Sequence, residues 1–411
     1  MESTYQKPAN ILNIELSKII ISHNDVRKNL EAGNEDSSIE GPAKSNNKHE
    51  RTSNIYLKNE GGYVGEKFRS QPRKKEDKIT IISTSPSTSM FGYLDPWADP
   101  EYQQALEMKQ ELIEKYSGTT VDDIFNGDTL ENEFGTCYIL KSEYNLQMSK
   151  YSRDICYQNL YSDLQLVYGI GPHYKSKLNH EGYSTLHDLK KHPRWCNPAE
   201  QVIDIISEGD VINLHDWMKR YYPVSHPCVY QTSSFFDSEE LVIFDIETMG
   251  LFESPIILLG IAKQRNNILT TTQILLKDIS NEPSALLETY KKLDESTAIL
   301  SYNGKSFDIP YLQSRLAFYG LSALNEKTHF DLLHYTRRAW RTKLDNCKLN
   351  TVEDYLGVKR DIDLPSSLVP SFYDTYLKTG NPGPLVPIIE HNKQDLVSLV
   401  LLYNKLHEVW T

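Results

Sequence analysis

Two acidic side chains interrupt an apolar stretch in the second half of the chain. The stretch, LVIFDIETMG at residues 241–250, places Asp245 and Glu247 two positions apart. Side chains alternate along a strand, so both carboxylates share a face with Leu241 and Ile243. Burial and mutual repulsion both disfavour ionisation of such a pair, and a bound divalent cation removes both problems. Hard oxygen ligands favour Mg²⁺ or Mn²⁺, whereas a solvated strand end is the structural alternative.

A third acidic residue, Asp308, follows a predicted strand at 297–302 and lies at the start of a predicted helix. Pro310, two residues later, is typical of a first helical turn, so Asp308 is also a candidate N-cap. Capping and metal binding are compatible roles for one carboxylate. The position therefore predicts a helix entry and leaves a metal-binding role open.

The last predicted helix carries His391 and Asp395 within an apolar stripe. The other residues of that stripe recur at spacings of three and four: Ile388, Leu399, Leu402 and Leu406. A charge within such a stripe needs a partner. His391 and Asp395 lie one turn apart and can contact the same object. A simple His–Asp pair explains their spacing but not their place in the stripe.

The segments between these residues indicate the elements that position them. Strands are predicted at 255–262 and 268–276, and the short connections favour an antiparallel meander with the strand at 241–248. A helix is predicted at 284–295 from its apolar spacing. The pattern indicates an α/β domain over residues 239–411.

Three motifs in this domain, FDIETMG, YNGKSFDIPYL and HNKQDLVSL, resemble those of the DEDD (DnaQ-like) 3′–5′ exonucleases of the ribonuclease-H-like superfamily. The second and third are most similar to the YprB-like branch. The resemblance covers residues 239–411. It implies a mixed sheet, an antiparallel meander plus parallel strands, flanked by helices. It further implies that Asp245, Glu247, Asp308 and Asp395 hold two Mg²⁺ or Mn²⁺ ions and that His391 is the general base.

One spacing departs from the family pattern. The histidine type of this family usually places its histidine five residues before the last aspartate, whereas His391 precedes Asp395 by four. On a helix this turns the side chain by roughly 100°. The spacing of His391 and Asp395 is instead that of the tyrosine type of the family.

The implied activity is metal-dependent hydrolysis of phosphodiester bonds in DNA or RNA that carries a free 3′ end. Two alternatives stay open: a catalytically inactive nucleic-acid-binding scaffold and an RNA-processing endonuclease. The sequence does not distinguish DNA from RNA, and physical reasoning alone permits endonuclease cleavage equally well.

A small all-α module is predicted at 153–220. Its turn Gly169-Ile-Gly171 precedes a helix that contains Lys175. Paired glycines permit a sharp turn that exposes backbone N–H groups at a helix start, where phosphate binds. The segment resembles a helix-hairpin-helix module, which implies contact with nucleic-acid backbone. The alternative is a helical turn that merely requires glycine.

Arg337, Arg338 and Arg341 lie on a predicted helix and are further candidates for binding phosphate. The alternative is a solvated helix face. Because the net charge is −12, the chain lacks the overall basic surplus common in nucleic-acid-binding proteins, and local patches must supply the contacts.

The remaining segments and the composition predict how the chain is divided and what class of protein it is. Residues 1–88 are predicted to be a disordered tail, 89–152 a partly ordered helix and strand segment, and 221–238 a linker. Five widely spaced cysteines without a Cys-x-x-Cys motif indicate neither a disulfide framework nor a zinc finger. We found no secretory signal and no run approaching the ~20 apolar residues of a membrane span. A cytoplasmic protein without a membrane partner is expected, and the sequence identifies no protein partner.

Overall fold

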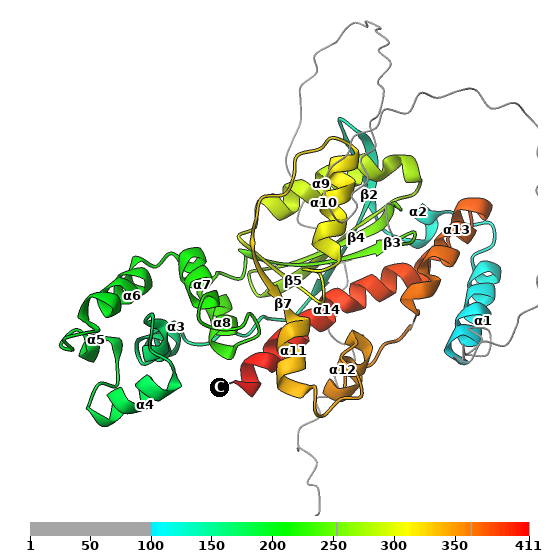
Figure 1. The fold of residues 1–411 in the computed structure, drawn as a ribbon. Helices are drawn as coiled ribbons and strands as arrows, with labels where there is room; N and C mark the ends of the chain where they lie inside the picture. The colour runs from blue at the N-terminus through cyan, green and yellow to red at the C-terminus, as the bar shows by residue number, and fades with distance from the viewer. Residues whose placement is uncertain (1–99, 252–253, 363, 411) are drawn as a thin grey trace, which may run out of the picture. The chain divides into compact units, whose positions relative to one another are not determined.

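The computed structural model describes residues 100–251, 254–362 and 364–410, so the predicted tail at 1–88 lies outside the described residues. The centre of this part is a seven-stranded sheet with the order β1-β2-β5-β4-β3-β6-β7 (Figure 1). The strands are β1 (Asp128–Asn132), β2 (Gly135–Tyr144), β3 (Leu241–Thr248), β4 (Ile256–Arg265), β5 (Ile268–Leu275), β6 (Ala298–Ser301) and β7 (Thr328–Asp331).

The sheet combines both strand directions. Strands β3, β4 and β5 form the predicted antiparallel meander, while β6 runs parallel to both β3 and β7. Helices cover both faces, which confirms the mixed, helix-flanked α/β fold expected from the sequence. Within the described residues, no helix combines the length and the apolar character that a membrane crossing needs.

The alternation of β3 decides which side chains meet which helices. Leu241 and Ile243 pack in one core with the middle and end of α14 (Leu385–Val409). Val242 and Phe244 pack in the other core with α9 (Glu282–Asp294) and α10 (Asp308–Phe318). Asp245 and Glu247 follow the first pair and therefore face α14.

Residues 128–144 extend the sheet beyond the 239–411 segment that the sequence motifs mark out. Strand β2 pairs antiparallel with β5, from Tyr138 opposite Leu275 to Tyr144 opposite Leu269. Residues 137–140 are buried in succession. The expected helix and strand segment at 89–152 thus contains α1 (Pro100–Lys115), α2 (Val121–Ile124), β1 and β2, and its strands belong to the central sheet.

Residues 153–220 form a group of short helices. Its elements are α3 (Arg153–Tyr161), the short 3₁₀ helix η5 (Leu164–Leu166), α4 (Pro172–His180), α5 (Leu186–Leu189), α6 (Cys196–Glu208) and α7 (Val211–Lys219). Gly169 has φ +85°, a conformation that favours glycine, and Gly171 is the N-cap of α4. The module has its own apolar core, which includes Leu166, Ile170 and Leu178.

Residues 221–238 differ from the linker that we expected. They form α8 (Pro227–Gln231) and the 3₁₀ helix η6 (Thr232–Phe235). Tyr230 is fully buried and donates a hydrogen bond to the carbonyl of Tyr403 on α14 at 2.6 Å. Phe235 and Phe236 are also buried. These aromatic residues supply enough apolar surface to fold the segment, despite its proline and serine content.

Three more helices complete the domain: α11 (Leu332–Trp340), α12 (Leu349–Leu356) and α13 (Val369–Thr379). Helices α11, α12 and α13 all contact α14. The long helix α14 therefore lies between the sheet and these helices, where its side chains can reach both.

Candidate active site

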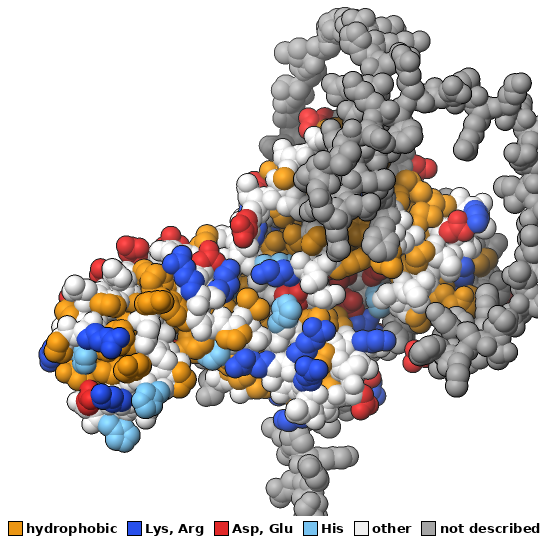
Figure 2. All heavy atoms as spheres, viewed as in Figure 1, with side chains coloured by type: hydrophobic (Ala, Val, Ile, Leu, Met, Phe, Trp, Pro, Cys, Tyr) orange, Lys and Arg blue, Asp and Glu red, His pale blue; other side chains and the backbone are white. Residues whose placement is uncertain are grey.

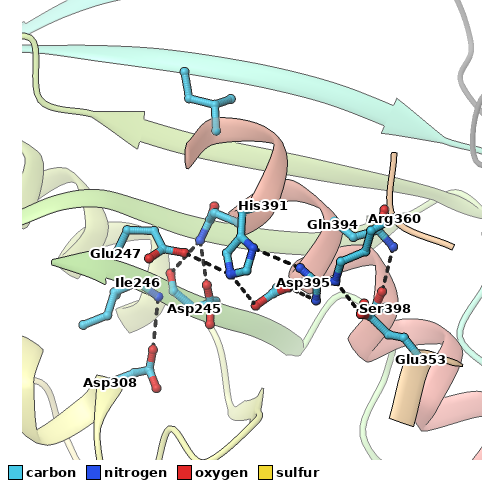
Figure 3. A network of polar contacts seen from close by, with 12 residues as sticks. Asp245, Ile246, Glu247, Asp308, Glu353, Arg360, His391, Gln394, Asp395 and Ser398 are labelled. Atoms are coloured by element: carbon cyan, nitrogen blue, oxygen red, sulfur yellow. Dashed lines mark hydrogen bonds and ion pairs between the residues drawn. The ribbon is translucent and has the colours of Figure 1, made fainter. Parts of the chain in front are cut away.

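The two acidic residues of β3 both interact with α14 (Figure 3). The side-chain amide of Asn392 donates a hydrogen bond to Oδ2 of Asp245 at 2.8 Å. Nε2 of His391 lies 3.9 Å from Oε1 of Glu247. Glu247 is buried, with 7% of its surface exposed. The strand therefore does not end in solvated acids, and the alternation of β3 presents both carboxylates to one helix.

Asp308 reaches the same strand from α10. The helix begins at Asp308 itself, its N-cap is Phe307, and no side chain caps it, so the N-cap alternative for Asp308 is wrong. Instead, Oδ1 of Asp308 accepts a hydrogen bond from the backbone N–H of Ile246 at 3.1 Å. The pairing of β6 with β3 ends at Ile243 and Leu300, so this carboxylate takes over a backbone donor beyond the ladder.

Asp395 completes the acidic cluster from α14, together with His391. Oδ2 of Asp395 lies 3.8 Å from Nε2 of His391. His391 is buried, as are Ile388, Leu399 and Leu402 on the same face of the helix. The stripe predicted from spacing is therefore real, and its two polar members turn toward the acids of β3 (Figure 3).

The electrostatics show that the carboxylates share one environment. Burial raises the pKa of Asp245 well above its ordinary value, and the negative charges of Asp395 and Asp308 raise it further. Burial raises the pKa of Glu247 well above its ordinary value too, and the negative charges of Asp395 and Asp308 raise it further. Burial also raises the pKa of Asp308 to about 7. Burial and neighbouring negative charges thus disfavour the ionised forms of Asp245, Glu247 and Asp308, and a cation among them would relieve this.

The donor chemistry fits a divalent cation, because carboxylate oxygens are the ligands that Mg²⁺ and Mn²⁺ prefer. The geometry of these side chains is open, in the sense that the potential ligands lie too far apart for one ion to bind them together. Across the described ranges, no three His, Cys, Asp or Glu side chains are close enough as they stand to hold a metal ion. Joint chelation by these acids therefore requires their side chains to move closer together.

Arg360, which the sequence analysis did not single out, contacts this cluster directly (Figure 3). Its Nη2 donates to Oδ1 of Asp395 at 2.5 Å, and its Nη1 lies 3.0 Å from Nδ1 of His391. Its Nε donates to Oε2 of Glu353 on α12 at 2.5 Å. Arg360 lies in the loop after α12, outside any periodic segment, so no spacing rule connects it to the motifs.

Asn392 was also missed, although it lies within the motif HNKQD. It is fully buried, and its Oδ1 accepts a hydrogen bond from Nε2 of Gln273 on β5 at 2.8 Å. Gly260 on β4 lies directly beneath it: a Cβ there would be 2.3 Å from Oδ1 of Asn392. The signal available in the sequence was an amide directly after His391 on a helix predicted to be buried, since buried amides need hydrogen-bond partners.

A cleft of about 1100 Å³ opens beside the cluster. Its lining includes His391 and Asp395 together with Arg337, Arg341, Lys348 and Arg360. Arg338 does not line this cleft. Figure 2 shows Lys and Arg side chains gathered over α11 in this view. Two of the three arginines expected to bind phosphate therefore line the same cleft as His391 and Asp395.

The remaining predicted contacts, Gly169, Gly171 and Lys175, belong to the helical module and do not line the cleft. Nζ of Lys175 forms an ion pair with Oδ1 of Asp163 at 3.0 Å. Asp163 also accepts a hydrogen bond from Tyr222. Lys175 thus has a structural contact within the module.

Part of this chain is similar in sequence to known proteins. Residues 242–407 match the family model described as RNase_H superfamily. Over 174 residues, 41% of this chain, the sequence is 38% identical to the uncharacterized protein YprB of Bacillus subtilis (strain 168). The family B DNA polymerase from the archaeon Pyrobaculum calidifontis aligns with 41% of this chain at 18% identity and a TM-score of 0.34.

The aligned region spans 42% of YprB and 24% of the polymerase chain, so each comparison concerns a part of both proteins. The segment that matches the family model, residues 242–407, carries Asp245, Glu247, Asp308, His391 and Asp395. Residues 242–407 thus match the RNase_H superfamily model, and the mixed, helix-covered sheet is consistent with a ribonuclease-H-like fold.

Proposed function

We propose that this protein is a metal-dependent nuclease that hydrolyses phosphodiester bonds, acting as a 3′–5′ exonuclease on DNA or RNA. The observation that carries the proposal is the convergence of four carboxylates from β3, α10 and α14 in one buried environment. Burying like charges together is unfavourable unless a cation joins them, and divalent cations are cofactors of phosphodiester hydrolysis.

Asp245, Glu247, Asp308 and Asp395 would hold two Mg²⁺ or Mn²⁺ ions. When bound, such ions supply an activated water and stabilise the charge on the leaving oxygen. The protein's own contribution is to fix the oxygens. Asn392 orients Asp245, the backbone of Ile246 orients Asp308, and Arg360 orients Asp395.

His391 is the candidate general base, because its Nε2 points between the carboxylates of Glu247 and Asp395. Its other nitrogen faces Nη1 of Arg360. A guanidinium can only donate, so Nδ1 accepts in this contact and the neutral ring carries its proton on Nε2. Accepting a proton at Nε2 therefore requires the imidazole to turn away from Nη1, while Arg360 keeps its two carboxylate contacts.

The cleft supports a nucleic-acid substrate. A site made of carboxylates repels phosphate, so cations nearby must hold the chain. Arg337, Arg341 and Lys348 line the same cleft as His391 and Asp395. A polynucleotide in this cleft would have its backbone against the basic residues and its scissile phosphate near the acids.

The test uses the full chain with single- and double-stranded DNA and RNA, labelled at either end, over a Mn²⁺ titration. We expect metal-dependent release of mononucleotides from the 3′ end, and its loss in Asp245→Asn and Asp395→Asn with an unchanged circular dichroism spectrum. Retention of cleavage in either variant would refute the site. Internal fragments as first products would indicate an endonuclease instead.

A nucleic-acid-binding protein without catalysis is the second candidate. The open geometry favours it, because no three potential ligands in the described part of the chain are placed to chelate a metal. It predicts binding of an oligonucleotide with no nucleotide release at any Mn²⁺ concentration. The same titration therefore separates the two candidates.

A further inference from the structure

Two buried ion pairs connect Glu353 on α12 with Asp395 in the acidic cluster. Arg360 lies between Glu353 and Asp395 and contacts each at 2.5 Å. The exposed fractions of the three side chains are 8% for Arg360, 3% for Glu353 and 13% for Asp395. Two carboxylates thus share one guanidinium that is almost completely removed from solvent (Figure 3).

The contact of Arg360 with Asp395 gives the two carboxylate oxygens of Asp395 different neighbours. Nη2 of Arg360 donates to Oδ1 of Asp395. Oδ2 of Asp395 instead faces Nε2 of His391, which also faces Glu247. Because the guanidinium is planar and donates in fixed directions, its contact with Oδ1 determines where Oδ2 points.

Two interpretations of Arg360 are possible in principle: a temporary cation that a metal displaces, or a fixed support for Asp395. Glu353 favours the support. It holds Nε of Arg360 from the far side, and its other oxygen, Oε1, is buried without a hydrogen-bond partner in the structure. Burying a carboxylate in this way is unfavourable without its cation. The pair Glu353–Arg360 also adds no net charge to the surroundings of the cluster.

We propose that Arg360, anchored by Glu353, is a positioning residue that binds Oδ1 of Asp395 and thereby presents only Oδ2 to a divalent cation. This inference rests on the proposed metal-dependent function. It assigns to the loop after α12, which none of the motifs includes, a direct influence on cation affinity. Supporting residues of this kind change metal affinity by about 10–100-fold when they are replaced.

The experiment measures Mn²⁺ affinity of the full chain without nucleic acid, by electron paramagnetic resonance of the free ion. The main variant is Glu353→Gln/Arg360→Gln, which has the same net charge as the wild type, so a changed affinity reports geometry. We expect binding at least about tenfold weaker. Arg338→Gln, which removes a charge from α11 but lies outside the cleft lining, is the control and should bind as the wild type does.

Arg360→Lys is a second variant in case the double variant does not fold. It keeps the charge but cannot hold Glu353 and Asp395 with two separate nitrogens, and we expect weaker binding here also. A thermodynamic cycle then adds Arg360→Gln to Asp395→Asn. If Arg360 acts through Asp395, the second substitution causes no further loss of affinity.

Each outcome decides the role. Unchanged or tighter Mn²⁺ binding in the folded variants, with wild-type binding intact, overturns the positioning role and leaves the nuclease proposal standing. Additive losses in the cycle also overturn it, because Arg360 would then act independently of Asp395. Failure of the wild type itself to bind Mn²⁺ overturns the metal centre and this role together.

Discussion

Asn392 on α14 holds Asp245 on β3: its side-chain Nδ2 donates to Oδ2 of the aspartate at 2.8 Å. The amide is held in turn by Gln273 on β5, whose Nε2 donates to Oδ1 of Asn392. Gly260 on β4 leaves the space that the amide fills. Three neighbouring strands and one helix therefore determine the orientation of a single carboxylate.

Gly260→Ala tests this arrangement. The added methyl group would lie 2.3 Å from Oδ1 of Asn392, so the amide must move and Asp245 loses its donor. We expect Mn²⁺ affinity to fall by about 10–100-fold, measured by calorimetry. Gly171→Ala is the matched control, because a Cβ at that glycine meets nothing within 4 Å. Equal affinities in the two variants would contradict the role of Asn392.

The acidic cluster predicts an unusual dependence of stability on pH in metal-free protein. The folded state raises the pKa of Asp308 from 3.8 to about 7, and it raises those of Asp245 and Glu247. The folded protein therefore binds these protons more tightly than the unfolded chain, so their stabilisation is lost as pH rises between about 4 and 7.

We expect the urea midpoint of metal-free protein to fall from pH 5 to pH 8, and Mn²⁺ to reduce that fall. Asp308→Asn removes one titrating group and should flatten the curve. A midpoint that rises with pH across this range in the wild type, or a curve that Asp308→Asn leaves unaltered, would show that the cluster does not govern it.

The cleft predicts different roles for neighbouring arginines of one helix. Arg337 and Arg341 line the cleft, whereas Arg338 does not. Alanine at either lining position should weaken oligonucleotide binding and reduce the slope of log K against log salt by about 1, and Arg338→Ala should change neither. Fluorescence anisotropy at several salt concentrations measures both quantities. A similar loss in all three variants would place the substrate elsewhere.

A buried ion pair behind the site predicts a stability effect. Glu282 is fully buried, and its carboxylate accepts hydrogen bonds from Arg315 and from the backbone N–H of Ile256. Glu282→Ala leaves the Arg315 charge buried without this partner and should reduce the free energy of unfolding by about 3–5 kcal/mol. Lys378→Ala, which breaks an exposed pair with Asp374, should cost less than about 1 kcal/mol. Urea denaturation compares the two.

His391→Ala should lower the turnover rate by about 10²–10⁴-fold if the imidazole is the general base. Nε2 of His391 faces the carboxylates of Glu247 and Asp395, so the residue is placed to act there. Single-turnover cleavage at saturating Mn²⁺ measures the effect. Full activity in the variant would remove His391 from the mechanism and leave the carboxylates in place.

Local periodicity was sufficient to predict the strand that carries Asp245 and Glu247 and the helix that carries His391 and Asp395. The alternation of β3 placed Asp245 and Glu247 on one face, and the spacing in α14 placed His391 in a buried stripe. The start of α10 was predicted within one residue, although Asp308 contacts β3 rather than capping the helix. Each of these features depends on neighbours in the chain.

Features that depend on distant partners were not predictable in this way. Arg360 lies in an irregular loop, and only the fold brings it to Asp395, 35 positions away. Tyr230 follows a proline in a segment with serines, and its contacts with distant residues such as Tyr403 and Tyr335 make it part of the core. A single sequence gives no local signal for contacts of this kind.

The pairing of β2 with β5 bears on how the C-terminal half of the chain can be prepared. A recombinant fragment that begins at residue 239 would lack β2 and leave the N–H and C=O groups along one side of β5 facing solvent. Such bare edges recruit further strands and drive proteins into aggregates. Fragments of this protein intended for crystallisation or assay should therefore retain residues 128–144, and with them the whole helical module that follows in the chain.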